Sequence, residues 1–119
     1  VEIYVVEAVP GSLNTITLSG PSSIPAGLLA GFLIDGAPSN SPWYLMASST
    51  NTGLIFQGHA FDLGLPVRMI ATGTTTGTGE ATPVLRIPQS AAGWTGYLEC
   101  AVLKAGQWYD SNLHTLAIH

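Results

Sequence analysis

Turn-forming residues recur along the whole chain, and their spacing is the feature that most limits its fold. The sequence holds 14 Gly and 8 Pro in 119 residues, spread so that turn signals lie roughly ten residues apart. Between the turns, apolar residues alternate with polar ones, which is the pattern of half-buried strands and not of helices. We therefore expect a single all-β domain over residues 1–119, an antiparallel sandwich or barrel of about 8–9 strands.

Individual strands are predicted wherever an alternating apolar run lies between turn residues. Within the second one, Ile16 and Leu18 are expected to point inward and Thr17 outward. The Thr- and Gly-rich segment Gly73–Glu80 is expected to be an exposed hairpin loop, because such residues make a poor core. The expected strands are Val1–Val9, Leu13–Ser19, Gly27–Asp35, Trp43–Ser48, Leu54–Gly58 with Ala60–Leu63 as one or two, Pro66–Thr72, Ala81–Ile87, Trp94–Lys104 and Leu113–Ile118.

Both faces of the first predicted strand, Val1–Val9, are apolar. Val, Ile, Tyr and Ala occupy both sides of its pleat, with Glu2 on one of them. Isolated domains protect an exposed strand with charge or Pro, so we expect this strand in the centre of its own sheet or against a neighbouring subunit. In the second case it would fill a groove of the next copy. The residues predicted at that interface are Val1, Ile3, Tyr4, Val5, Val6 and Val9.

Charged side chains are scarce. Three are basic and seven acidic, 8% of the chain, against about 25% in typical soluble domains. Arg68, Arg86 and Lys104 form no basic run, so nucleic-acid binding, which needs clustered bases, is not expected. A surface built from Ser, Thr, Asn, Gln and Gly repels its own copies only weakly. We therefore expect a secreted chain, or one that copies of itself cover.

No apolar stretch approaches the roughly 18 residues that a membrane-spanning helix requires, so no membrane insertion is expected. The chain begins at Val1 and not at Met. From this we expect a mature extracellular or cell-surface chain whose leader has been removed.

The cysteine and the histidines point to no cofactor. Cys100, the single cysteine, lies within an apolar run and is expected to be a buried small hydrophobe without reactivity. His59, His114 and His119 show no metal-binding pattern. We expect them to be exposed or satisfied by hydrogen bonds, with no metal and no cofactor in the protein.

The acidic residues show no context that marks a general acid or base. A calcium site at Asp110, Ser111 and Asn112 is an alternative, because calcium prefers oxygen ligands, but no Asp-x-Asp pattern supports it. We expect no enzyme activity. The carboxylates considered were Asp35, Asp62, Glu80, Glu99 and Asp110.

Aromatic residues near strand ends offer a different possibility, a surface on which sugar rings stack. The competing interpretation is that they fill the core or an interface, as Trp and Tyr commonly do. The candidates for ligand stacking are Trp43, Trp94, Trp108 and Tyr109.

A series of short motifs runs in order between Leu13 and Ile118: Leu13–Gly20, Phe61–Pro66, Ile70–Thr75, Thr78–Ala81, Ile87–Pro88 with Ala91–Gly93, Tyr97–Leu98, Ser111–Asn112 and Leu116–Ile118. This order resembles a small β-sandwich domain of secreted planctomycete and myxobacterial proteins, where it often lies at the C-terminus of larger extracellular proteins. The resemblance implies an extracellular, immunoglobulin-like scaffold without catalytic residues. The chain departs from that pattern in standing alone and in its apolar first strand.

Together these features predict a non-catalytic extracellular structural protein that assembles with its own copies into a cell-surface or extracellular filament or matrix. The alternative is a carbohydrate-binding module of a larger secreted protein, with glycans as the partner.

Overall fold

The computed structural model describes residues 16–119. In that part of the chain the regular structure is β, apart from one turn of 3₁₀-helix at Gln89–Ala91. The strands are β1 (Thr17–Ser19), β2 (Ser23–Ile24), β3 (Leu29–Gly31), β4 (Leu33–Asp35), β5 (Pro42–Ser48), β6 (Leu54–Phe56), β7 (His59–Phe61), β8 (Arg68–Thr74), β9 (Val84–Arg86), β10 (Thr95–Lys104), β11 (Gln107–Asp110) and β12 (His114–Ile118).

The larger sheet is built around β10. Its strand order is β2-β12-β10-β5-β8, and β11 pairs with β10 beyond the end of β12. Along one edge β10 pairs with β5, from Tyr97 opposite Ser48 to Val102 opposite Trp43. Along the other edge it pairs first with β12 and then with β11. The long strand β10 is therefore held by main-chain hydrogen bonds on both sides.

A smaller layer packs against this sheet and completes a sandwich. In it β1 pairs with β4 and β3 pairs with β9. The residues between these strands continue the layer, because the Phe32 amide donates to the Pro83 carbonyl at 2.9 Å and Ile34 bridges to Ala81. Segment 29–35 thus lies between β1 on one edge and segment 81–86 on the other.

Alternate residues of both layers point between them and form the core. The predicted inward positions Ile16 and Leu18 are buried and Thr17 is exposed, as expected. Cys100 is fully buried in the same core, which confirms that prediction. The cluster also contains Ile24, Ala30, Phe32, Ile34, Trp43, Leu45, Ala81, Ile87, Leu98, Val102, Leu116 and Ile118.

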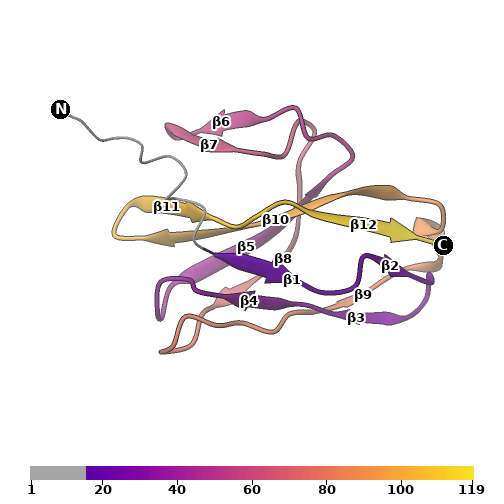
Figure 1. Ribbon diagram of the computed structural model, residues 1–119, viewed down its shortest axis with the longest axis horizontal. Helices are drawn as coiled ribbons and strands as arrows, with labels where there is room; N and C mark the ends of the chain where they lie inside the picture. The colour runs from indigo at the N-terminus through magenta and orange to yellow at the C-terminus, as the bar shows by residue number, and fades with distance from the viewer. Residues whose placement is uncertain (1–15) are drawn as a thin grey trace.

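A β-hairpin covers the opposite side of the larger sheet. Strands β6 and β7 pair with each other and lie across β10 and β11 from β1 and β4 (Figure 1). A cavity of about 300 Å³ remains beneath the hairpin, lined among others by Phe61, Ala101 and Trp108. Because of this cover, β10 is buried on both faces.

The predicted β-sandwich is confirmed, but the strand count was wrong. Residues 16–119 contain 12 strands where we expected about 8–9. The predicted strand Gly27–Asp35 divides at Phe32 into β3 and β4, and β11 forms between the predicted strands Trp94–Lys104 and Leu113–Ile118. Strand Val1–Val9 lies outside the described residues.

The pairing is also not wholly antiparallel, because β2 runs parallel to β12. The chain leaves the smaller layer after β1, turns at Gly20 and Pro21, and joins the edge of the larger sheet as β2. The predicted loop Gly73–Glu80 is shorter than expected, since β8 extends to Thr74 and Thr75 is buried.

Gly73 offers a test of the packing between β5 and β8. It lies opposite Trp43, and a Cβ atom there would lie 2.8 Å from Cζ2 of the buried indole. We expect Gly73→Ala to lower the free energy of unfolding by about 1–3 kcal/mol, the usual cost of overpacking. The measurement is urea denaturation.

The control is Gly31→Ala in β3, where nothing lies within 4 Å of the added Cβ. It should leave the urea midpoint unchanged or raise it slightly, since Gly in a strand is unfavourable. Equal midpoints for the two variants would contradict the proposed contact.

Candidate functional site

The most unusual polar residue of the fold is Glu99, in the middle of β10. Leu98 and Cys100 point into the sandwich core, so Glu99 points to the opposite face, beneath the hairpin. Its side chain is 0% exposed. A buried carboxyl is costly unless it is neutralised and hydrogen-bonded, so its surroundings must supply both.

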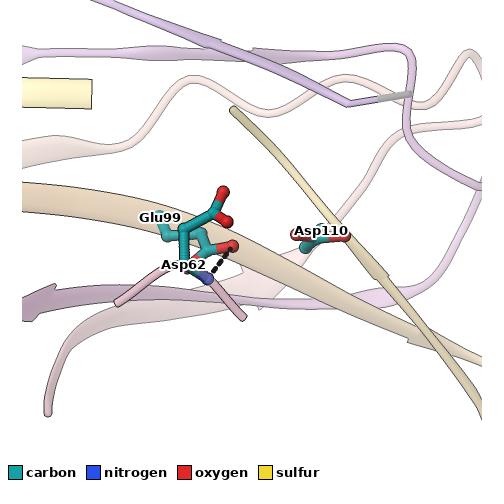
Figure 2. A group of neighbouring side chains, drawn as sticks. All are labelled: Asp62, Glu99 and Asp110. Atoms are coloured by element: carbon teal, nitrogen blue, oxygen red, sulfur yellow. Dashed lines mark hydrogen bonds between the residues drawn. The ribbon is translucent and has the colours of Figure 1, made fainter. Parts of the chain in front are cut away.

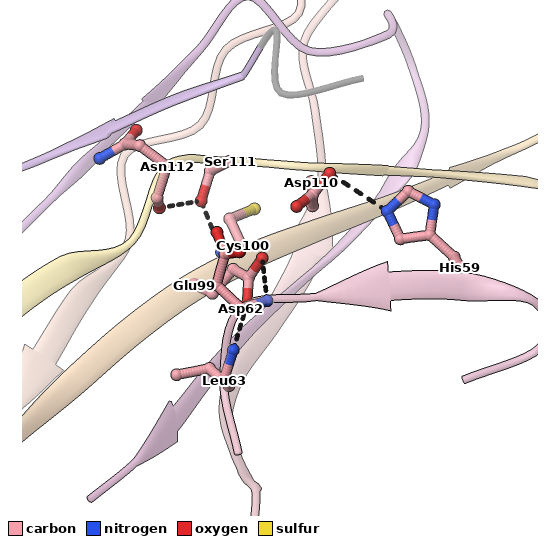
Figure 3. A network of polar contacts seen from close by, with 8 residues as sticks. All are labelled: His59, Asp62, Leu63, Glu99, Cys100, Asp110, Ser111 and Asn112. Carbon is pink, nitrogen blue, oxygen red and sulfur yellow. Dashed lines mark hydrogen bonds and ion pairs between the residues drawn. The ribbon is translucent and has the colours of Figure 1, made fainter. Parts of the chain in front are cut away.

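The segment that follows β7 supplies the hydrogen bonds. The backbone amides of Asp62 and Leu63 donate to Oε1 of Glu99 at 3.0 and 3.1 Å. The Asp62 amide also lies 3.3 Å from Oε2. Figure 3 shows these bonds joining the hairpin to the strand below it. The Glu99 side chain therefore fixes the point at which the hairpin returns to the sheet.

Asp110 and His59 extend this network. Asp110, the last residue of β11, is buried, and its Oδ1 lies 3.1 Å from Nε2 of His59 on β7. The carboxylates of Asp62, Glu99 and Asp110 offer oxygens within 4.8 Å of one another (Figure 2). Asp62 is exposed, whereas the other two carboxyl groups are enclosed.

Glu99 retains a proton at neutral pH. Burial, followed by the hydrogen bond with Asp110 and the charge of Asp110, raises its pKa to about 8, against the lowering effect of the Leu63 and Asp62 amides. The protonated Glu99 carboxyl therefore lies beside Asp110, whose Oδ1 contacts His59. Burial, and then the charge of Glu99, also raises the pKa of Cys100 to about 12, so this thiol stays protonated.

We interpret Glu99, Asp110 and His59 as a structural polar network beneath the hairpin. Oε1 of Glu99 accepts two backbone amide hydrogens and Oδ1 of Asp110 contacts His59, so these groups have partners within the protein. From the sequence we assigned Glu99 no structural role. The available signal was a single acidic residue inside the apolar run Tyr97–Leu103, since only a partnered acid is stable there.

The oxygens considered for calcium serve the fold. Ser111 Oγ accepts the Cys100 amide at 2.9 Å and donates to the Asn112 carbonyl at 2.8 Å. The Asn112 side chain accepts the Leu18 amide at 2.8 Å and donates to the Leu18 carbonyl at 3.1 Å. These bonds attach β1 to the chain after β11, so Ser111 and Asn112 do not converge with Asp110 on one point.

All three histidines are hydrogen-bonded, as expected. Besides the contact between His59 and Asp110, His114 Nε2 lies 2.8 Å from the Pro21 carbonyl oxygen. His119 Nδ1 lies 3.1 Å from Oγ of Ser23. They lie in different parts of the fold and face different partners.

The aromatic candidates are not gathered on one surface. Trp43 is buried in the core, and Trp94 and Tyr109 pack against that core while partly exposed. Trp108 lies under the hairpin, where Nε1 donates to Oε1 of Gln57 at 2.9 Å and the ring meets Phe61 edge-on. Trp43 thus offers no free face for a sugar, and glycan binding at the other three stays a prediction.

A second candidate site is an open groove at one side of the sandwich, which we call the edge groove. It has a volume of about 730 Å³ and lies where the outer edges of β8 and β9 diverge. Within residues 16–119, β8 pairs only with β5 and β9 only with β3 and the segment that continues it. The lining includes Ile70, Val84, Leu85, Ala91 and Trp94, together with the exposed Arg68 and Arg86.

The interface residues predicted between Val1 and Val9 lie outside the described residues. Among the residues that the structure does describe, no helix is long and apolar enough to cross a membrane.

The two packed layers define an immunoglobulin-like β-sandwich, and solved structures with similar folds agree. The sulfur carrier protein SoxY from Chlorobium limicola is 13% identical, with a TM-score of 0.52 over 89% of this chain and 80% of SoxY. A Thermotoga maritima protein provisionally named a superoxide reductase is 6% identical, with a TM-score of 0.61 over 95% of this chain and 92% of that one. No family model and no curated protein matches the chain. At these identities the likeness shows the fold alone.

The raised pKa of Glu99 predicts a pH dependence of stability. Between pH 4.5 and about 8 the folded protein holds a proton on Glu99 that the unfolded chain has released. The contribution of Glu99 to the free energy of unfolding is therefore complete below pH 4.5 and is lost as the pH rises through about 8. Glu99→Gln, which is neutral throughout, should flatten that decline in the free energy of unfolding, measured by urea denaturation across this range.

Glu80→Gln is the matched control, because Glu80 is exposed in a turn, and it should follow the unsubstituted protein. If the Glu99→Gln and unsubstituted curves run parallel from pH 4.5 to about 8, Glu99 does not hold the proton.

Proposed function

We propose that this chain is a non-catalytic extracellular structural protein that assembles with copies of itself into a filament or matrix. The observation that carries the proposal is the apolar outer face of the smaller layer. Leu29, Leu33 and Val84 are 58%, 39% and 63% exposed, whereas the residues next to them in sequence that point inward are buried or half-buried. Both faces of this layer are therefore apolar.

These exposed side chains form one patch, because they lie on adjoining strands. Val84 of β9 is opposite Gly31 of β3, which lies midway between Leu29 and Leu33. A contiguous exposed apolar patch on a soluble domain commonly marks a contact with another protein. A sheet face of this kind is stable in water when a second layer covers it.

The distribution of charge supports a second copy as that layer. Of the eight charged residues within 16–119, Glu99 and Asp110 are buried. Six remain for the whole surface of this part of the chain. Two of these lie on the strands that carry the patch, Arg86 on β9 and Asp35 at the end of β4. Repulsion between copies that meet through this face is weak.

The extracellular location is part of the same proposal. It rests on the low charge of the chain and on the resemblance to a domain of secreted planctomycete and myxobacterial proteins. The absence of a catalytic role rests on the enclosed, hydrogen-bonded state of the buried acids and the protonated Cys100 thiol.

Substitutions on the patch test the assembly. Leu29→Lys combined with Leu33→Lys, two patch residues outside the lining of the edge groove, should shift the protein toward monomer, because two charges would have to be buried in each contact. We expect the association constant to fall at least about tenfold, which corresponds to about 1.4 kcal/mol. The measurement is sedimentation velocity over a range of concentrations, with electron microscopy for filaments.

Thr95→Lys, an exposed position at the start of β10 in the larger sheet, adds charge away from the patch and should leave assembly unchanged. An unsubstituted protein that sediments as a monomer at every concentration would overturn the proposed function.

A further inference from the structure

The edge groove presents two unpaired strand edges. In the described part of the chain, no strand lies beyond β8 in the larger sheet or beyond β9 in the smaller layer. Each edge carries main-chain N–H and C=O groups that an added strand can pair with. The space between them is lined by Ile70, Leu85 and Trp94, so alternate apolar side chains of an added strand would be accommodated there.

The groove also gathers most of the positive charge of the chain. Two of the three basic residues, Arg68 of β8 and Arg86 of β9, line it, one on each wall. Both are exposed. The third, Lys104, lies elsewhere and donates to the Ser39 carbonyl at 3.1 Å. A strand that enters this groove is therefore favoured if it is apolar and carries acids.

The first nine residues of the sequence have these properties. Segment Val1–Val9 is apolar on both sides of the pleat, and its only charged residues are Glu2 and Glu7. An odd separation places these two acids on opposite sides of an extended strand, as the two arginines lie on opposite walls of the groove. Nine extended residues span about 30 Å, enough to cover the seven residues of β8.

We propose that the edge groove of one copy binds segment Val1–Val9 of a second copy as an added strand, with Glu2 and Glu7 facing Arg68 and Arg86. This inference rests on the proposed self-assembly and adds to it a second contact, beside the apolar patch of the smaller layer. Each copy then donates a strand to one neighbour and accepts a strand from another. A head-to-tail contact that does not close produces a fibre.

The strand order favours a neighbouring copy over the same one. β1 lies on one edge of the smaller layer and β9 on the other, with segment 29–35 between them. The chain therefore enters the described fold on the edge opposite its own groove. A neighbour's groove is reached without crossing the layer.

Charge reversal tests the contact in both directions. The donor variant carries Glu2→Arg and Glu7→Arg, and the acceptor variant carries Arg68→Glu and Arg86→Glu. Alone, each variant places like charges together where the added strand meets the groove. Each should therefore associate at least about tenfold more weakly than the unsubstituted protein at low salt. Mixed in equal amounts, each variant again meets opposite charges, so assembly should return with the two alternating. Sedimentation velocity gives the sizes, and circular dichroism checks that each variant is folded.

Lys104→Glu is the matched control, because it reverses the one base outside the groove, and it should assemble normally. The inference is overturned if the separate variants assemble as the unsubstituted protein does, or if the mixture stays as dissociated as its components. In both cases the unsubstituted protein still assembles, so the proposed function survives. A protein that is monomeric throughout overturns both.

Discussion

The burial of Glu99 is the constraint on which the arrangement of the larger sheet depends. Its neighbours on β10 belong to the sandwich core, so the side chain must point to the outer face. A carboxyl group there needs a cover that excludes water and donors that replace it. The hairpin β6–β7 and the amides of Asp62 and Leu63 meet both needs. Retaining the proton removes most of the cost of burying a charge.

This arrangement gives the two sides of the molecule different characters. On the larger sheet, the hairpin covers the outer face and encloses Glu99 and Asp110. On the smaller layer, the outer face carries exposed Leu29, Leu33 and Val84 without a cover among the described residues. With two of the few charges enclosed, the remaining surface has little means of preventing contact between copies. Exposed apolar side chains also lie on the hairpin, where Ile55 and Phe56 are 77% and 51% exposed, so each layer carries some of the apolar surface of the fold.

The sequence predicted those features that depend on local patterns. Alternation placed Ile16 and Leu18 in the core, and the apolar run around Cys100 indicated a buried thiol; both are confirmed. The sequence patterns did not predict those elements that depend on contacts between distant segments. β11 forms because Gln107–Asp110 pairs with the end of β10, and Phe32 interrupts a predicted strand at the point where the layer changes partners. The sequence left Trp43 with two possible locations, the core or the surface. The pairing of Trp43 with Gly73 between β5 and β8 places it in the core.

By itself, the sequence determined the β class, the scarcity of charge and the apolar character of Val1–Val9, because composition and period-two alternation are local properties. Only the tertiary structure decided that Glu99 lies beneath a hairpin and shares its environment with Asp110, 11 positions further along the chain. It also decided that Arg68 and Arg86 line one groove. These pairs meet because strand order and register bring distant segments together, and neither can be inferred from the spacing of the residues alone.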